Sequence, residues 1–274
     1  MATVNTNPGA MIALQNLTKT NHDIGIVQNR ISTGLKVGSA KDNGAVFAIA
    51  QNMRADVASY NAVSQSLGRG LSTVDVAIAA AEGISDLLIE MKEKAMSAAD
   101  SSLDTASRNA LNEDFTALRD QIDTMYSNAG FNGINLVDGS TVNIQALADA
   151  DNSSFITVTA ENMSLSGSVV TLASTATIST STAASTAVDT ITTSLENVNE
   201  ALARMGTASK KLELHQTFVG KLSDALVAGI GNLVDADLAA ESAKLQSLQV
   251  KQQLGVQALG IANTAPQMFL SLFG

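Results

Sequence analysis

Histidines, cysteines and clustered acids are the residue types that most often carry catalysis or bind metals. The chain has two histidines, His22 and His215, and no cysteine. The lack of cysteine excludes thiol catalysis, thiolate metal ligands and disulfides together. The two histidines lie far apart, and no His-Glu-x-x-His motif of a zinc protease occurs. We therefore expect both histidines at solvated helix positions in a chain that is not an enzyme.

The acidic group Asp235, Asp237 and Glu241 is the remaining candidate for a metal site. It resembles part of a calcium cluster, but the glycine and the spacing of a calcium-binding loop are missing. Acids at the start of a helix accept hydrogen bonds from free backbone N–H groups and stabilise the helix dipole. We interpret the group as a helix N-cap with acids in the first turn, and we expect neither a metal nor a cofactor.

Charge is distributed unevenly along the chain. The net charge is −10, and no Lys or Arg occurs between Asp120 and Ala203, although acids are frequent there. A solvated outer surface is the simplest explanation of this acidic stretch. Because basic clusters are absent, nucleic acid and anionic membranes are unsuitable partners. No run of about 20 consecutive apolar residues occurs, so no segment is expected to span a membrane.

Apolar residues recur in long seven-residue periods, which are typical of packed helices. Such periods cover 46–95, 111–129 and 191–233, with Asp104 or Ser107 as the N-cap of the second helix. A helix with a single apolar stripe is not stable alone and must pack against others. We therefore expect a mainly α fold, an elongated antiparallel coiled-coil helix bundle with a small β-rich insertion.

The insertion lies between the second and third of these helices, where Ser and Thr dominate the composition. Turn dipeptides at 132–133 and 138–139 flank the segment 134–137 and predict a hairpin. Two short strands are expected at 155–159 and 168–172, and a strand or a solvated loop at 174–186. We expect this insertion to lie on the surface and not to form a core.

Both ends of the chain predict amphipathic helices. Ala10 to Ile31 repeats apolar residues by seven, and so does Leu238 to Leu259. The C-terminal helix is apolar on more than one face, so one partner helix cannot cover it, and assembly between chains is expected. In a single chain we expect these ends to be largely disordered until they pack in the polymer. The residues expected to form the polymerisation interface are Leu14, Leu17, Ile24, Ile31, Leu238, Leu245, Leu248 and Leu259.

Several sequence blocks resemble the two signatures of bacterial flagellin. The N-terminal blocks are Asn5-Thr6-Asn7, Leu14-Gln15-Asn16-Leu17, 30–37, Ser39-Ala40-Lys41-Asp42, Ala48-Ile49-Ala50 and Phe131-Asn132-Gly133. The C-terminal blocks are 235–241, Ala262-Asn263, Pro266-Gln267 and Leu270-Ser271-Leu272. The order and spacing of these blocks at opposite ends make the resemblance specific, and it covers roughly 1–139 and 188–274.

The resemblance implies an arrangement in layers, in which the terminal helices form an inner coiled coil and the helical rod surrounds it. The corresponding division assigns 1–42 and 235–274 to the inner coiled-coil domain, 43–139 and 188–234 to the helical rod domain, and 140–187 to the Ser/Thr-rich β-containing surface insertion. The outer domains that vary within the family are reduced here to this insertion. The Ser and Thr residues of this insertion either form a plain solvated surface or carry O-linked sugars, which similar flagellins often have on outward-facing hydroxyls. The candidate positions for such sugars are Thr171, Ser174, Thr177 and Ser181.

The resemblance also implies a function, which is polymerisation into the extracellular flagellar filament for motility. No cleavable secretory signal is visible, which agrees with export by the flagellar type III route. The implied partners are other flagellin subunits, a hook-filament junction protein, the filament cap and an export chaperone. Two alternatives are a hook-filament junction protein and another type III-secreted helical protein that acts as a binding module.

Overall fold

The computed structural model describes residues 6–273, with side chains as far as residue 264. Asn5 and the side chains of the block 266–272 lie outside the described residues. The chain divides into a terminal unit, Met1–Ala55 with Ala225–Gly274, and a middle unit, Asp56–Asp224. Its elements are α1 (Pro8–Thr33), α2 (Gly44–Ala99), α3 (Thr105–Asn128), β1 (Gly130–Phe131), β2 (Ile134–Asn135), β3 (Asn143–Leu147), β4 (Phe155–Thr159), α4 (Ser181–Val234) and α5 (Leu238–Phe273).

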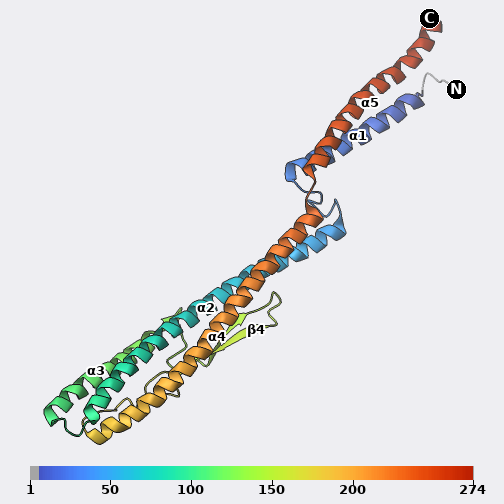
Figure 1. Ribbon diagram of the computed structural model, residues 1–274. Helices are drawn as coiled ribbons and strands as arrows, with labels where there is room; N and C mark the ends of the chain where they lie inside the picture. The colour runs from blue at the N-terminus through green and yellow to red at the C-terminus, as the bar shows by residue number, and fades with distance from the viewer. Residues whose placement is uncertain (1–5, 274) are drawn as a thin grey trace. The chain divides into compact units, whose positions relative to one another are not determined.

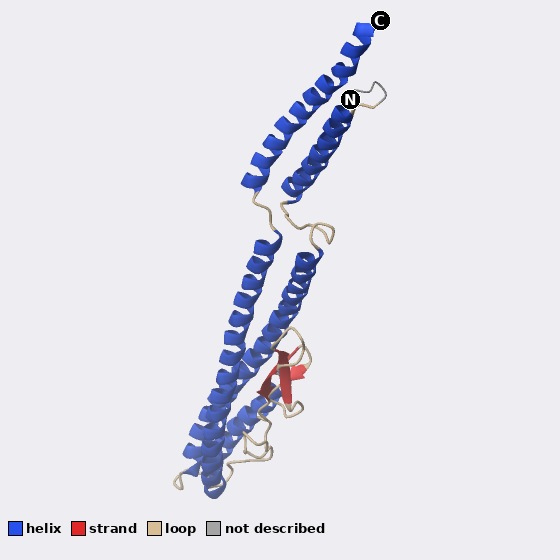
Figure 2. Cartoon of the chain, turned by 90° about the vertical axis from the view of Figure 1, so that its right-hand side faces the viewer, coloured by secondary structure: helices blue, strands red, loops and turns tan. Residues whose placement is uncertain are grey.

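The expected mainly helical, antiparallel architecture is confirmed. Within the middle unit α4 begins beside the end of α2, where the Ser181 hydroxyl donates to the Ala99 carbonyl at 2.7 Å. Further along, Gly70 of α2 lies against Leu212 of α4, so the two helices run in opposite directions. α3 returns along α2 in the same unit (Figure 1). In the terminal unit α1 and α5 lie side by side (Figures 1 and 2).

α2 and α4 build the core of the middle unit from heptad positions. The main stripe of buried positions on α2 alternates by three and four residues, namely Val63, Leu67, Gly70, Val74, Ala77, Ala81, Ile84, Leu88, Met91, Ala95 and Ala98. Many of them are small, so the helices approach closely. At Gly83, which faces α3, an added Cβ would lie only 2.4 Å from Met125 Cε. Gly83 therefore leaves room for the end of the Met125 side chain of α3, and α2 continues through this position as one unbroken helix.

The start of α3 is held by a side-chain cap. The Asp104 carboxylate accepts hydrogen bonds from the Ser107 backbone N–H at 2.9 Å and from its hydroxyl at 2.8 Å. These bonds hold the pKa of the Asp104 carboxyl below its usual range. Of the two expected caps, Asp104 is therefore the one used. Arg108 then donates to the carbonyls of Ala98 and Asp100, which satisfies the end of α2.

The expected hairpin after α3 is present, although it is short. β1 and β2 are joined by Asn132 and Gly133, whose φ angles of 51° and 79° suit the two-residue turn that matches strand twist. β4 confirms the strand expected at 155–159. Its partner β3 was not anticipated, because its sequence Asn-Ile-Gln-Ala-Leu contains a single β-branched residue, Ile144, and no aromatic residue.

The strand expected at 168–172 is wrong. Val169, Val170 and Leu172 are buried in the helical core, and the Val169 N–H donates to the Asn162 carbonyl instead of to a neighbouring strand. Burial against helices therefore replaces strand pairing there. The strand alternative for 174–186 is also wrong, since this segment is a loop as far as Thr180 and α4 begins at Ser181.

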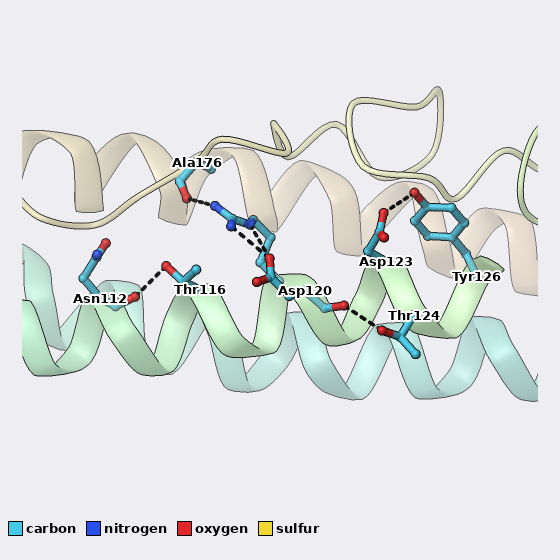
Figure 3. Close-up of polar contacts among 8 residues, drawn as sticks. Asn112, Thr116, Asp120, Asp123, Thr124, Tyr126 and Ala176 are labelled. Atoms are coloured by element: carbon cyan, nitrogen blue, oxygen red, sulfur yellow. Dashed lines mark hydrogen bonds and ion pairs between the residues drawn. The ribbon is translucent and has the colours of Figure 1, made fainter. Parts of the chain in front are cut away.

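The insertion contributes to the core, contrary to expectation. Before α4 begins, the buried residues of the insertion that join the helical core are Ala146, Ile156, Val158, Met163, Val169, Val170, Leu172 and Ile178. Polar contacts hold the same segment in place. Arg119 of α3 donates to the Ala176 carbonyl at 2.9 Å and pairs with Asp120, also at 2.9 Å (Figure 3). Glu161 accepts two hydrogen bonds from Arg204 of α4, which raise the pKa of that guanidinium.

The two histidines differ from each other in environment. His22 is exposed on α1, as expected. His215 is half-buried on α4, and its Nε2 lies 2.7 Å from the Ala148 carbonyl oxygen at the end of β3. Its ring also lies 5.9 Å from that of Phe218. The expectation of a solvated position is therefore wrong for His215, which attaches the β3–β4 sheet to α4.

Leu88 and Ile89 provide a matched test of the heptad core. Leu88 is fully buried, whereas the adjacent Ile89 is 55% exposed. We expect Leu88→Ala to lower the free energy of unfolding of the middle unit by about 2–5 kcal/mol because it leaves a cavity. Ile89→Ala should change it by less than about 1 kcal/mol. Urea unfolding followed by circular dichroism measures both, and equal effects would contradict the assigned register.

Candidate assembly surfaces

α1 and α5 pair through one heptad seam within the chain. On α1 the less exposed positions of the seam are Ala10, Ala13, Leu17, Thr20, Ile24, Val27 and Ile31. On α5 they are Glu241, Leu245, Leu248, Gln252, Gly255, Leu259 and Ala262. Both sets alternate by three and four residues, the spacing of a coiled-coil interface. The other described side chains of α5 up to residue 264 are exposed.

Polar contacts fix the register of this seam at three levels. The Asn7 side-chain amide donates to the Ala262 carbonyl at 2.7 Å, and the Gln252 amide donates to Asn21 Oδ1 at 2.8 Å. At the other end Arg30 pairs with Glu241 at 3.0 Å, in a place where both side chains are largely covered. Because each contact joins residues more than 200 positions apart, the two ends of the chain are aligned residue by residue.

The segments that follow α1 and precede α5 also bond to each other. Gly34 caps α1 with a φ of 72°, which favours glycine, and its carbonyl accepts the Ala236 N–H at 2.8 Å. The N–H groups of Lys36 and Val37 donate to the Val234 carbonyl. The blocks 30–37 and 235–241, which were noticed separately in the sequence, therefore form one structural junction.

The block Ser39-Ala40-Lys41-Asp42 forms a turn. The Asp42 carboxylate accepts the N–H groups of Gly38 and Ser39 and the Ser39 hydroxyl, at 2.9–3.1 Å. Bonds from Ser39 hold the pKa of Asp42 below its usual range. The turn directs the chain from the junction into α2.

The acidic group near the start of α5 is a helix cap, as expected. The Asp237 carboxylate accepts the N–H groups of Ala239 and Ala240 at 2.9 and 3.0 Å, and Glu241 is engaged with Arg30. Among residues 6–264 no group of three or more His, Cys, Asp or Glu side chains is placed to hold a metal ion. No helix in the described part of the chain is long and apolar enough to cross a membrane.

α5 carries a second apolar face that none of the described residues covers. Val250, Leu254 and Ile261 are 55%, 58% and 72% exposed. At 100° per residue these three share one face, and the seam with α1 lies on the opposite side of the helix. The expectation that α5 is apolar on more than one face is confirmed. α1 adds exposed apolar side chains of its own, namely Met11, Ile12, Leu14 and Ile26.

The residues expected at the polymerisation interface divide into two groups. Those that lie in the intrachain seam are Leu17, Ile24, Ile31, Leu245, Leu248 and Leu259. Leu14 and Leu238 are exposed outside it. The predicted interface residues do not include Val27, which is buried in the seam, or Val250, Leu254 and Ile261, which form the exposed face of α5. An available signal was the helical spacing, because residues three or four positions from the main repeat, such as Val27 and Leu248, share its face, whereas Val250, Leu254 and Ile261 lie on the opposite face.

The four candidate glycosylation hydroxyls are not equivalent. The Ser181 hydroxyl donates to the Ala99 carbonyl, and the Thr171 hydroxyl lies 3.1 Å from that of Ser194. Ser174 and Thr177 are exposed, and their hydroxyls make no hydrogen bond found among the described residues. Only the latter two therefore present hydroxyls that are both exposed and unengaged.

Comparison with known proteins identifies the family. A model of the bacterial flagellin N-terminal helical region matches residues 4–142, and one of the C-terminal helical region matches 188–273. The flagellin FljK of Caulobacter vibrioides is 58% identical over 98% of both chains. The flagellin of Brucella melitensis is 36% identical over 100% of this chain and 99% of its own.

The chain belongs to the bacterial flagellin family. As a flagellin it is a structural subunit of the extracellular flagellar filament, exported by the flagellar apparatus, and not an enzyme. Both family regions coincide with the helices described above, and the stretch between them contains most of the insertion.

Solved structures agree at the level of fold. A Bacillus cereus flagellin matches with a TM-score of 0.50 at 22% identity over 56% of this chain and 88% of its own. A chain described as a flagellar hook-associated protein from Vibrio parahaemolyticus matches with a TM-score of 0.57 at 11% identity, over 71% of this flagellin and 100% of its own length. Fold alone therefore does not separate flagellins from hook-associated proteins, whereas the sequence identity places this chain among the flagellins.

Proposed function

We propose that this flagellin polymerises through the exposed face of α5, formed by Val250, Leu254 and Ile261, together with the exposed apolar residues of α1. The observation that carries the proposal is that this face of α5 is exposed, whereas the opposite face packs against α1 within the chain. A helix with apolar residues on two opposite faces needs a second partner. Copies of the same chain provide it, and burial of these side chains drives association.

The same contacts support the layered division that we propose. We assign 1–42 and 235–274 to the inner coiled coil because α1 and α5 pair along most of their described length. The segments 43–139 and 188–234 form the helical rod, and 140–187 is its insertion. At the boundary between these segments, within the terminal unit, the N–H groups of Lys36 and Val37 donate to the Val234 carbonyl.

We propose that the other partners of this flagellin meet the same helices. An uncovered apolar face on α5 needs protection before assembly, which is the task of an export chaperone. A hook-filament junction protein at the base and a cap at the tip would meet the α1 and α5 faces of the first and last subunits. An exposed apolar surface of this kind is a typical binding site for other proteins, which is the physical basis for proposing these partners.

Charge introduced on the exposed face of α5 tests the polymerisation surface. We expect Leu254→Asp to abolish filament formation because a carboxylate would be buried unpaired between subunits. Gln253→Asp is the matched control, since it adds the same charge one residue away, among the exposed glutamines Gln246, Gln249 and Gln257. Electron microscopy and sedimentation of the purified chain measure the outcome. Normal filaments from Leu254→Asp would refute the assignment.

A substitution in the seam between α1 and α5 tests whether these two helices must pair for polymerisation. Leu245→Asp places a charge between α1 and α5, so it should also prevent polymerisation while α2 stays folded. Circular dichroism should show loss of helix limited to the ends. Filaments that form normally from this variant would contradict a paired α1 and α5 in the assembly.

Hydrogen exchange tests when the terminal helices become ordered. One seam of seven positions per helix is a small core, so we expect amides of α1 and α5 to exchange rapidly in the monomer. In filaments they should be protected by at least about 100-fold. Amides of α2 near Leu88 serve as the reference, protected in both states. Equal protection of α1 and α5 in monomer and filament would show that assembly is not what orders them.

Mass spectrometry tests the proposed O-glycosylation. We expect sugars on the exposed and unengaged hydroxyls of Ser174 and Thr177, and none on Thr171 or Ser181. Intact filament protein should exceed the bare 28.2 kDa chain, and Ser174→Ala with Thr177→Ala should remove the excess. A mass equal to the bare chain, or an excess that survives both substitutions, would contradict these sites.

A further inference from the structure

Two methionine side chains stand out among those that the structure describes, because they are exposed. The chain has nine methionines, of which Met1 and Met268 lie outside the described side chains. Met11 on α1 and Met96 on α2 are 56% and 58% exposed. The others are buried or half-buried, namely Met53, Met91, Met125, Met163 and Met205. Since an oxidant must reach the thioether sulfur, Met11 and Met96 are the reactive positions among the described methionines.

The two exposed methionines have different neighbours on their helices. Met11 lies beside Ile12 and Leu14, which are 60% and 54% exposed, and α1 carries no charged residue before Lys19. The thioether of Met11 is therefore part of an uncharged, mainly apolar surface.

Met96 lies in charged surroundings instead. Lys92 and Glu93 precede it by four and three positions, so they share its side of α2, and Glu93 is exposed. An additional polar group at Met96 therefore changes the character of that surface little, whereas at Met11 it changes the surface from apolar to polar.

Met11 also lies at the end of the α1–α5 pair where the uncovered face of α5 is most exposed. The Asn7 carbonyl accepts the Met11 N–H at 3.1 Å, and the Asn7 amide donates to the Ala262 carbonyl at 2.7 Å. Met11 is therefore one helical turn from the level of Ala262. Ile261, which precedes Ala262, is 72% exposed. Met11 and Ile261 thus belong to the same end of the proposed polymerisation surface.

Oxidation converts the apolar thioether of methionine into a polar sulfoxide. A sulfur lone pair attacks one oxygen of hydrogen peroxide, the O–O bond breaks, and the second oxygen leaves as water after it takes up the proton. Sulfur loses two electrons, and the peroxide gains them. The sulfoxide oxygen is a hydrogen-bond acceptor, and burial of an unpaired acceptor among apolar side chains is costly.

We propose that Met11 is a modification site, oxidised by hydrogen peroxide in the free subunit, and that its sulfoxide excludes the subunit from the filament. This inference rests on the proposed polymerisation through α5 and α1 and adds a chemical condition to it, because only subunits with reduced Met11 assemble. In the filament, neighbouring copies cover Met11 and protect it from the oxidant. The modification is reversible, since methionine sulfoxide reductases restore the thioether.

Mass spectrometry of peptides tests whether Met11 is reactive and whether assembly covers it. Hydrogen peroxide should oxidise Met11 and Met96 in the monomer, whereas Met91 and Met163, which are fully buried, should stay reduced. In filaments we expect Met11 to oxidise at least about tenfold more slowly than in the monomer. Equal oxidation rates of Met11 in monomer and filament would overturn the proposal.

Polymerisation of the oxidised monomer tests the consequence. Oxidation should raise the critical concentration for filament growth by at least about tenfold, and treatment with sulfoxide reductases for both epimers should reverse the rise. Met11→Leu keeps an apolar side chain but has no thioether there. Peroxide should change its critical concentration by less than about twofold, measured against the same variant untreated. Met96→Leu is the matched control, since it removes the other exposed thioether and should stay as sensitive to peroxide as the unmodified chain.

The outcomes distinguish this inference from the polymerisation proposal. If Leu254→Asp blocks assembly while subunits with Met11 sulfoxide assemble normally, polymerisation through α5 stands and the role of Met11 is wrong. If Leu254→Asp assembles normally while Met11 sulfoxide blocks assembly, the assignment to α5 is wrong and the Met11 site stands on α1. Protection by Met96→Leu in place of Met11→Leu would also contradict the role of Met11.

Discussion

The structure depends on how many apolar faces each helix has and how many of them its own chain can cover. α5 has two such faces on opposite sides, and α1 covers only the one that contains Leu245 and Leu248. The face with Val250, Leu254 and Ile261 is left to solvent or to another molecule. Because burial of apolar surface is the main driving force for association, an incompletely covered helix of this kind favours assembly over a closed monomer.

The middle unit shows the opposite case. α2 packs against both α3 and α4, and the insertion covers part of what the helices leave open, so that large side chains such as Leu88 and Phe115 are fully buried. Such a core is complete within one chain. The two units therefore differ in how completely they bury their apolar surface. Both use heptad seams, but three helices and an insertion enclose a core in the middle unit, whereas the two helices of α1 and α5 leave apolar surface exposed.

The junction between α1 and α5 explains why sequence signatures occur at both ends of the chain. Arg30 pairs with Glu241, Gly34 accepts a hydrogen bond from Ala236, and Asp237 caps α5. Each residue has a chemical task that its neighbours cannot perform. A positive φ favours glycine, a free helix N-terminus favours an acid, and a covered carboxylate needs a cation.

The sequence by itself determined the helices, because the seven-residue apolar period depends only on local helix geometry. It also determined the Asn132-Gly133 turn, the Asp237 cap and the surplus apolar face of α5. Only the tertiary structure decided which apolar stripe of one helix packs against which stripe of another. It placed Ile24 and Leu248 in an intrachain seam, buried Val170 and Leu172 without a strand, and engaged His215 and Ser181 with distant carbonyls. The physical reason is that a period shows which face is apolar, whereas the partner of that face depends on contacts between segments far apart in the chain.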